Sequence, residues 1–158
     1  MRKLIVKLFD APVSTYIEPN ALADSLVVSR RELVEYLTTD VGLKVGSKVR
    51  QQASVPKWIA DSVEYSKACL RGLVDTDGCL IIHKYSVKNK TYKYKKLGFS
   101  NSSRPIIDFV WSTLERLGIK SRVAKKGKEV RVDGQTDMKK YFSIIGSNNP
   151  KHLRRWLK

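Results

Sequence analysis

Apolar and polar residues in the second part of the chain recur first at helical spacing and then in alternation, the pattern of an α+β protein. In the predicted helix 105–117, Pro105 suits the first turn and Gly118 suits the stop. Its predicted buried stripe is Ile106, Val110, Trp111, Leu114 and Leu117. The other elements expected after residue 60 are a helix at 61–76, strands at 79–85 and 92–100 around a basic turn, a hairpin at 122–132, a helix at 136–144 and a last basic helix from Pro150.

The first part of the chain shows a shorter set of the same signals. A helix is expected over residues 1–9, followed by strands at 13–17 and 25–28 with a turn at Pro19-Asn20. Ser29 is the expected cap of a helix over 30–38. Gly42, Gly46 and Pro56 lie among Lys and Gln, which is typical of a connecting segment.

An internal repeat relates these two parts. The order helix, hairpin, helix, Gly, Lys runs from Leu4 to Lys48 and again from Val110 to Lys151. Sequence identity is slight, so the order of elements carries this inference. The helix and two strands of residues 61–100 have no equivalent in the first part.

Positive charge is concentrated in the second part. The chain has 31 Lys and Arg against 15 Asp and Glu, a net charge of +16. Residues 1–60 hold nine basic and six acidic side chains, and residues 61–158 hold 22 and nine. This distribution favours a polyanionic partner, namely nucleic acid. A ribosomal-type protein and a surface merely rich in Lys are the alternatives, while no apolar run approaches the roughly 20 residues of a membrane span.

The cysteines and histidines argue against structural zinc. Cys69 and Cys79 form no CxxC pair, and His83 and His152 are the only histidines. We therefore interpret Cys69 as packed in a helix and Cys79 as the start of a strand. A reduced, cytoplasmic setting is expected, with nucleoid association if the source is prokaryotic.

One predicted helix has an edge with almost no side chains. Ala68, Gly72 and Thr76 follow one another at i, i+4 and i+8. Glycine inside a helix costs roughly 1 kcal/mol relative to alanine, so a close neighbour such as another helix backbone is the natural explanation. Leu70, Leu73 and Val74 form the opposite face, which suits burial under a sheet.

Asp77 ends this helix, where the helix dipole disfavours a carboxylate. A bound divalent cation would compensate that cost. The alternative is that Asp75 and Asp77 merely open a turn with Gly78.

The stretch 68–79, ACLRGLVDTDGC, resembles the LAGLIDADG signature over nine positions, with departures at Arg71, Val74 and Thr76. The segment before the motif resembles the one between the halves of double-motif members, at Val55-Pro56, Trp58-Ile59 and Glu64-Tyr65. Residues 145–151 resemble the family's closing segment, so the resemblance covers nearly the whole chain. It implies the α+β fold of homing endonucleases, with αββαββα halves and a saddle-shaped antiparallel sheet. Residues 1–57 would be a truncated first half (αββα) with a linker, and residues 58–158 a complete half-domain.

The resemblance also implies a chemistry. In this family two motif helices pair, and each gives its final Asp to a metal centre that hydrolyses DNA phosphodiesters. Asp77 would then be the metal ligand, with Mg²⁺ or another divalent cation, and Asp75 would be structural. Lys48 and Lys151 match the family's catalytic lysines, although plain phosphate contact is the alternative for each.

The strands after the motif would read double-stranded DNA through a basic, aromatic face. A solvated hairpin is the alternative. The residues expected to contact DNA are His83, Lys84, Lys88, Lys90, Tyr92, Lys93, Tyr94, Lys95, Ser100, Asn101, Ser103 and Arg104.

A single motif cannot build a paired metal site in one chain. We therefore expect a homodimer joined through Ala68, Gly72 and Thr76, acting as a site-specific DNA endonuclease. The alternatives are a fragment completed by another chain, or a catalytically inactive DNA- or RNA-binding relative such as a regulator or a maturase. A ribosomal-type RNA-binding protein is a more distant possibility.

Overall fold

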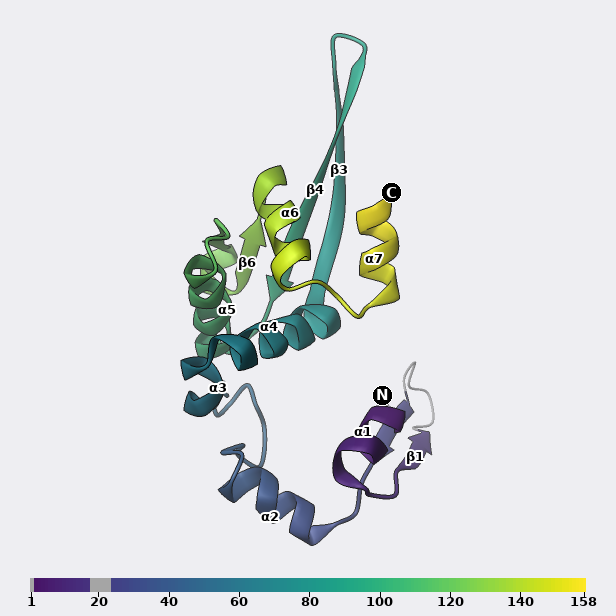
Figure 1. Cartoon of the computed structure of the whole chain (residues 1–158), viewed down its shortest axis with the longest axis vertical. Coiled ribbons are helices and arrows are strands. Elements are labelled where there is room, and N and C mark those ends of the chain that lie inside the picture. The colour runs from purple at the N-terminus through teal and green to yellow at the C-terminus, as the bar shows by residue number, and fades with distance from the viewer. Residues whose placement is uncertain (1, 18–23) are drawn as a thin grey trace. The chain divides into compact units, whose positions relative to one another are not determined.

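The computed structural model describes residues 2–17 and 24–158, which form two compact units, residues 1–45 and residues 46–158 (Figure 1). The predicted turn at Pro19-Asn20 lies outside the described residues. Residues 46–57, expected to be a linker, belong to the second unit by their contacts. Gln52 Oε1 accepts a hydrogen bond from Arg104 N at 2.9 Å, and Ala53 O accepts one from Ser103 Oγ at 2.5 Å.

The first unit is a helix, a hairpin and a second helix, in the expected αββα order. Its elements are α1 (Arg2–Phe9), β1 (Ser14–Ile17), β2 (Asp24–Val27) and α2 (Arg31–Thr39). The two strands are antiparallel, with Ser14 opposite Val27. The predicted cap at Ser29 is wrong, because Arg30 is the N-cap residue of α2 and it makes no side-chain capping bond.

The second unit follows the predicted αββαββα order around one antiparallel sheet, which confirms the fold class. The strands pair in the order β3-β4-β6-β5. The elements are α3 (Lys57–Asp61), α4 (Val63–Asp77), β3 (Gly78–Val87), β4 (Lys90–Ser100), α5 (Arg104–Arg116), β5 (Arg122–Ala124), a 3-10 turn η1 (Lys125–Gly127), β6 (Glu129–Val132), α6 (Gln135–Ile144) and α7 (Pro150–Leu157).

The predicted helix 61–76 corresponds to α4, and the short helix α3, which was not predicted, precedes it across Ser62. Ser62 has extended backbone angles, and its side chain accepts a hydrogen bond from Tyr65 N at 3.3 Å. This N-cap satisfies one of the free amides at the start of α4. Ser66, buried in α4, donates to Ile59 O at 2.9 Å and ties the two helices together.

The core lies between the helices and one face of the sheet. Leu80, Leu97, Phe99, Val130 and Val132 supply the sheet side. Leu70 and Val74 of α4, Ile107, Val110 and Leu114 of α5, and Met138 and Tyr141 of α6 supply the helix side. Over the residues that the structure describes, no helix has the length and apolarity needed to span a membrane.

The burial of α5 corrects one prediction. Trp111, predicted to be buried, is 41% exposed, whereas Ile107, left out of the predicted stripe, is fully buried. Val110 and Leu114 of the predicted stripe are buried as expected, and Ile106 and Leu117 pack partly against the core, so the error concerns Trp111 and Ile107.

Tyr141 is fully buried, yet its hydroxyl has no hydrogen-bond partner among the described residues. Burial, and then the negative charge of Asp75, raises the pKa of this phenol well above its ordinary value. A buried polar group without a partner costs about 1–3 kcal/mol. Tyr141→Phe should therefore leave the free energy of unfolding unchanged or raise it by about 1 kcal/mol in urea denaturation. A loss of more than about 1 kcal/mol would show that the hydroxyl is satisfied, for example by a bound water.

The hairpin of β3 and β4 extends well beyond the rest of the sheet (Figure 1). The two strands pair from Gly78↔Phe99 to Val87↔Lys90, but β6 pairs with β4 only from Leu97 to Ser100. Lys88 and Asn89 form the tip with positive φ angles of 45° and 60°, as a tight two-residue turn requires. The distal hairpin is thus a two-stranded arm, which we call the β3-β4 arm.

Candidate nucleic-acid interface and acidic helix end

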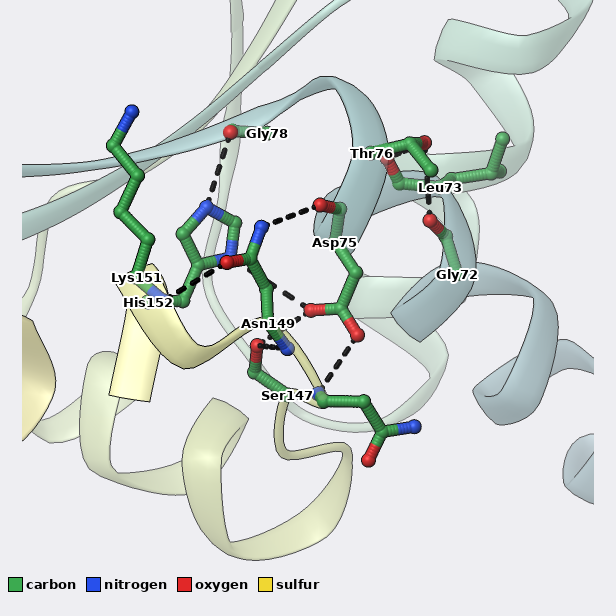
Figure 2. Close-up of polar contacts among 10 residues, drawn as sticks. Gly72, Leu73, Asp75, Thr76, Gly78, Ser147, Asn149, Lys151 and His152 are labelled. Carbon is green, nitrogen blue, oxygen red and sulfur yellow. Dashed lines mark hydrogen bonds and ion pairs between the residues drawn. The ribbon is translucent and has the colours of Figure 1, made fainter. Parts of the chain in front are cut away.

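The last turn of α4 is fastened to the segment before α7 through Asp75 (Figure 2). The Asp75 carboxylate accepts hydrogen bonds from Ser147 Oγ and, at 2.7 Å, from Asn148 N. Asn149 Nδ2 donates to Asp75 O at 2.7 Å, and the Asn149 side chain also caps α7 by accepting from Lys151 N at 2.9 Å. These contacts agree with the structural role expected for Asp75.

Helix α7 is held against the start of β3 by two further side chains. His152 is 3% exposed, and its Nε2 lies 3.2 Å from Gly78 O (Figure 2). Arg155 Nη1 donates to Leu80 O at 2.9 Å. Sequence reasoning did not assign these roles to His152 and Arg155, although the Asn149-Pro150 pair did indicate where α7 begins.

Gly78 is required where α4 turns into β3. A Cβ at this position would lie 2.4 Å from Val74 O and 2.8 Å from Val74 Cγ1. Gly78→Ala should therefore destabilise the protein by about 1–3 kcal/mol, since backbone cannot move aside as a flexible side chain can. The midpoint of urea denaturation measures this loss. Gly72→Ala, compared at protein concentrations low enough for the chain to be monomeric, is the matched control, because a Cβ there meets nothing within 4 Å among the described residues of one chain; equal losses in the two variants would refute the clash.

Asp77, by contrast, is exposed, and its carboxylate has no hydrogen bond or ion pair to any described residue. It is the last residue of α4, so the helix dipole does not favour its charge. Within the described ranges 2–17 and 24–158 no group of three or more His, Cys, Asp and Glu side chains could hold a metal ion. A metal ion held by the Asp77 carboxylate would therefore need its other ligands from outside the described residues of one chain.

The two lysines predicted to be catalytic are both exposed, and neither is bonded to Asp77. Lys48 lies in the turn before α3, where Lys48 O accepts from Ala53 N at 2.9 Å. Lys151 lies in the first turn of α7, and its side chain extends away from Asp75 (Figure 2).

The small-residue edge of α4 is open. Ala68, Gly72 and Thr76 are all exposed, and the Thr76 hydroxyl is satisfied within the helix by bonds to Gly72 O and Leu73 O. Tyr65, one turn before Ala68, is 55% exposed and meets Trp58 of α3 edge-on at 5.5 Å. A helix surface with small side chains, and with two aromatic rings at one end, suits the close approach of another helix.

The predicted DNA contacts divide between the two faces of the β3-β4 arm. His83, Lys90, Tyr92 and Tyr94 share the face that points away from the core, and Lys88 forms the tip. Lys84, Lys93 and Lys95 alternate with them and share the face of Leu80 and Leu97, which is the helix side. Lys95 is engaged there, since its Nζ donates to Trp156 O and lies 4.9 Å from the Trp156 ring centroid.

Stacked aromatic rings stiffen the outward face of the arm. Tyr85 stacks on Tyr92 at 5.4 Å and on Tyr94 at 5.5 Å, and His83 lies 5.9 Å from Tyr85. The hydrogen bond between the Tyr85 and Tyr94 hydroxyls raises the pKa of Tyr85. Tyr85 was not predicted as a contact, although strand alternation from His83 could have indicated it.

The contacts predicted in the loop after β4 differ in availability. Ser100 is exposed, and Asn101 Oδ1 accepts from Ser103 N at 2.8 Å. Ser103 is 2% exposed with its hydroxyl bonded to Ala53 O, so this side chain is engaged inside the protein. Arg104 is exposed and pairs with Asp108 at 2.8 Å.

Sequence reasoning missed a set of charged residues on the outward face of the sheet. Lys96 of β4, Arg122 of β5 and Arg131 of β6 lie on this face and are held by Asp133 and Glu129. They come together only through the strand register, which places Arg131 opposite both Gly98 and Arg122.

Comparison with known proteins agrees with this geometry. A family model described as a LAGLIDADG-like domain matches residues 64–155, from the first turn of α4 into α7. No curated protein matches the chain. The matched segment is more than half of the chain and contains α4, the sheet and the residues that fasten α7 to α4. The chain therefore belongs to the LAGLIDADG family of homing-endonuclease-type and related DNA-binding proteins.

Proposed function

We propose that this protein is a site-specific, double-stranded DNA endonuclease that acts as a homodimer. The observation that carries the proposal is the exposed, unpartnered carboxylate of Asp77 at the end of a helix with an open small-residue edge. A helix C-terminus disfavours an exposed carboxylate by about 0.3–1 kcal/mol, and a cation bound there would offset that cost.

Two copies are needed because one chain supplies one such carboxylate. Parallel pairing of two α4 helices through Ala68, Gly72 and Thr76, about a two-fold axis that runs along the pair, would bring their C-terminal ends together. Each Asp77 would then lie near its symmetry mate. Trp58 and Tyr65 would extend the interface at the other end of the helix.

A divalent cation fits this donor set. Members of the family generally use divalent metals, and Mg²⁺ prefers carboxylate, phosphate and water oxygens to His or Cys. Asp77 offers such an oxygen from each chain, and DNA phosphates would complete the shell. When bound, the metal would lower the pKa of water and stabilise charge on the phosphate oxygens.

The other residues of the chain position the DNA and the helix end. Asp75, Ser147 and Asn149 fix the last turn of α4, so that Asp77 has a defined place. Lys151 and Lys48 would contact phosphate or stabilise charge near it. The outward face of the sheet and its arm would lie along the major groove, where a two-stranded ribbon fits.

Cleavage selection tests this proposal directly. The purified protein is incubated with a library of duplexes, or with fragmented genomic DNA of the source, in the presence of Mg²⁺. We expect cutting at one long, specific sequence, and binding that weakens steeply with salt. Salt-sensitive binding without cleavage in any divalent metal would instead identify a binding-only relative, and preferential binding to RNA would point to a maturase.

A further inference from the structure

The outward face of the sheet contains a hollow of ≈ 230 Å³ between β3, β4 and β6. Gly98 lies in its floor, and Ile81, His83, Lys96, Arg131 and Asp133 line it. The hollow is on the side away from the core, since Gly98 is opposite Cys79 and Arg131 in the ladders.

Because Gly98 has no side chain, the Glu129 carboxylate can lie beside it on the outward face of the sheet. A Cβ at Gly98 would lie 3.2 Å from Glu129 Oε1, so any other residue at 98 would crowd the Glu129 carboxylate. Glu129 is 4% exposed, which is unusual for an ionised group without partners.

Glu129 is paired with two cations. Its Oε2 lies 2.9 Å from Arg131 Nη2 and 3.3 Å from Lys125 Nζ. Burial alone would raise the pKa of Glu129, but the hydrogen bonds and charges of Arg131 and Lys125 outweigh it and lower the pKa below its usual value. The carboxylate is therefore ionised at neutral pH and holds the guanidinium in place.

Arg131 keeps unused donors toward the hollow. Its side chain is 34% exposed, its Nε is buried, and its Nη1 makes no hydrogen bond to any described residue. Glu129 contacts the guanidinium as an ion pair through Nη2, so the N–H groups of Nη1 remain available. A guanidinium with two donors on one side matches the O6 and N7 acceptors of guanine in the major groove.

Asp133, which also lines the hollow, forms ion pairs with two other basic side chains. It lies 3.3 Å from Lys96 Nζ and 2.6 Å from Arg122 Nε. The two carboxylates thus fix the cations of three strands, β4, β5 and β6, in a set that remains net positive.

We propose that Arg131 reads a guanine in the DNA site, and that Glu129 is the residue that positions it. The inference rests on the proposed DNA-binding function and deepens it. A phosphate contact is the weaker interpretation, because a guanidinium shared with a buried carboxylate has lost much of its attraction for an anion. A guanidinium that is held in a fixed orientation by a carboxylate instead favours a partner with two acceptors at matching positions.

The test compares sequence preferences. Wild type, Arg131→Ala, Arg131→Lys and Glu129→Gln are each used to select duplexes from a library randomised around the binding site, without metal. Lys90→Ala, on the exposed arm, is the control for a phosphate contact. We expect the wild type to require guanine at one position of each half-site, and both Arg131 variants to lose that preference by about tenfold or more. The lysine variant retains the positive charge, so loss of the guanine preference in this variant would show that the two donors of the guanidinium are required.

Glu129→Gln should weaken the preference for guanine at the same position of the DNA site and leave the preferences at the other positions unchanged. It displaces the Arg131 side chain without removing it. Lys90→Ala should lower affinity for all sequences alike and reduce the salt slope by about one unit. If the Arg131 variants lost affinity equally for all sequences, or kept the wild-type preference for guanine, the inference would be overturned and the proposed function would stand. A wild-type protein that binds no duplex would overturn both.

Discussion

Asp77→Asn should abolish DNA cleavage while the protein still folds and binds its site. The substitution keeps the size of the side chain and removes the charge that would hold the cation. Metal ions contribute several kcal/mol of transition-state stabilisation, and each ~1.4 kcal/mol is tenfold in rate, so cleavage should fall at least about a hundredfold. Cleavage of a labelled duplex under single-turnover conditions measures this fall.

Folding should be unaffected or slightly improved in this variant. Asp77 has no partner among the described residues, and removing a carboxylate from a helix C-terminus is worth about 0.3–1 kcal/mol. Asp75→Asn, two residues earlier, is the matched control. It loses charged hydrogen bonds to Ser147 and Asn148, so it should lower the free energy of unfolding by about 1–3 kcal/mol. An Asp77→Asn protein that cuts at the wild-type rate would remove Asp77 from the site.

Gly72→Leu should separate the protein into monomers and stop cleavage. In a single chain a Cβ at Gly72 meets nothing within 4 Å among the described residues, and leucine has a higher helix propensity than glycine. In the proposed dimer both copies place leucine where the two backbones approach. Overpacking costs about 1–3 kcal/mol for each copy, which raises the dissociation constant of the dimer roughly tenfold to a thousandfold or more.

Sedimentation at several protein concentrations, with cleavage assays on the same samples, measures this effect. Lys139→Leu, on the exposed side of α6, adds the same side chain away from the proposed interface. It should leave both association and cleavage unchanged. A Gly72→Leu protein that still associates and cuts would show that α4 does not form the interface.

The elements of the fold could be predicted where one short-range signal decides them. The β3-β4 hairpin, α5 and α7 follow from alternation, Pro105 and Pro150. Helix α3 was missed, because it has only five residues and ends at the Ser62 cap of α4, too short for a periodic pattern to reveal. On α5 one position was assigned wrongly, because Trp111 was counted as core, whereas the core takes Ile107.

The site was predictable only in part for a similar reason. Asp77, Gly72 and their neighbours lie in one continuous motif, so spacing along one helix was sufficient to bring them together. Glu129, Arg131 and Gly98 come together through the register between β4 and β6, which no single strand reveals. Alternation did separate Lys93 and Lys95 from Tyr94, but it could not indicate which set the helices would cover.

Cross-linking at the edge of α4 tests the paired-helix account most directly. Gly72→Cys is made with Cys69 and Cys79 replaced by Ser, and mild oxidation is applied with and without DNA; Lys139→Cys serves as the surface control. A disulfide needs Cα atoms within about 7 Å of each other, so only a close helix pair can form one in high yield. If two α4 helices pair, Gly72→Cys should form a disulfide-linked dimer rapidly and almost completely, and Lys139→Cys should form none. A Gly72→Cys protein that stays monomeric while the wild type cuts its DNA site would contradict the paired-helix account.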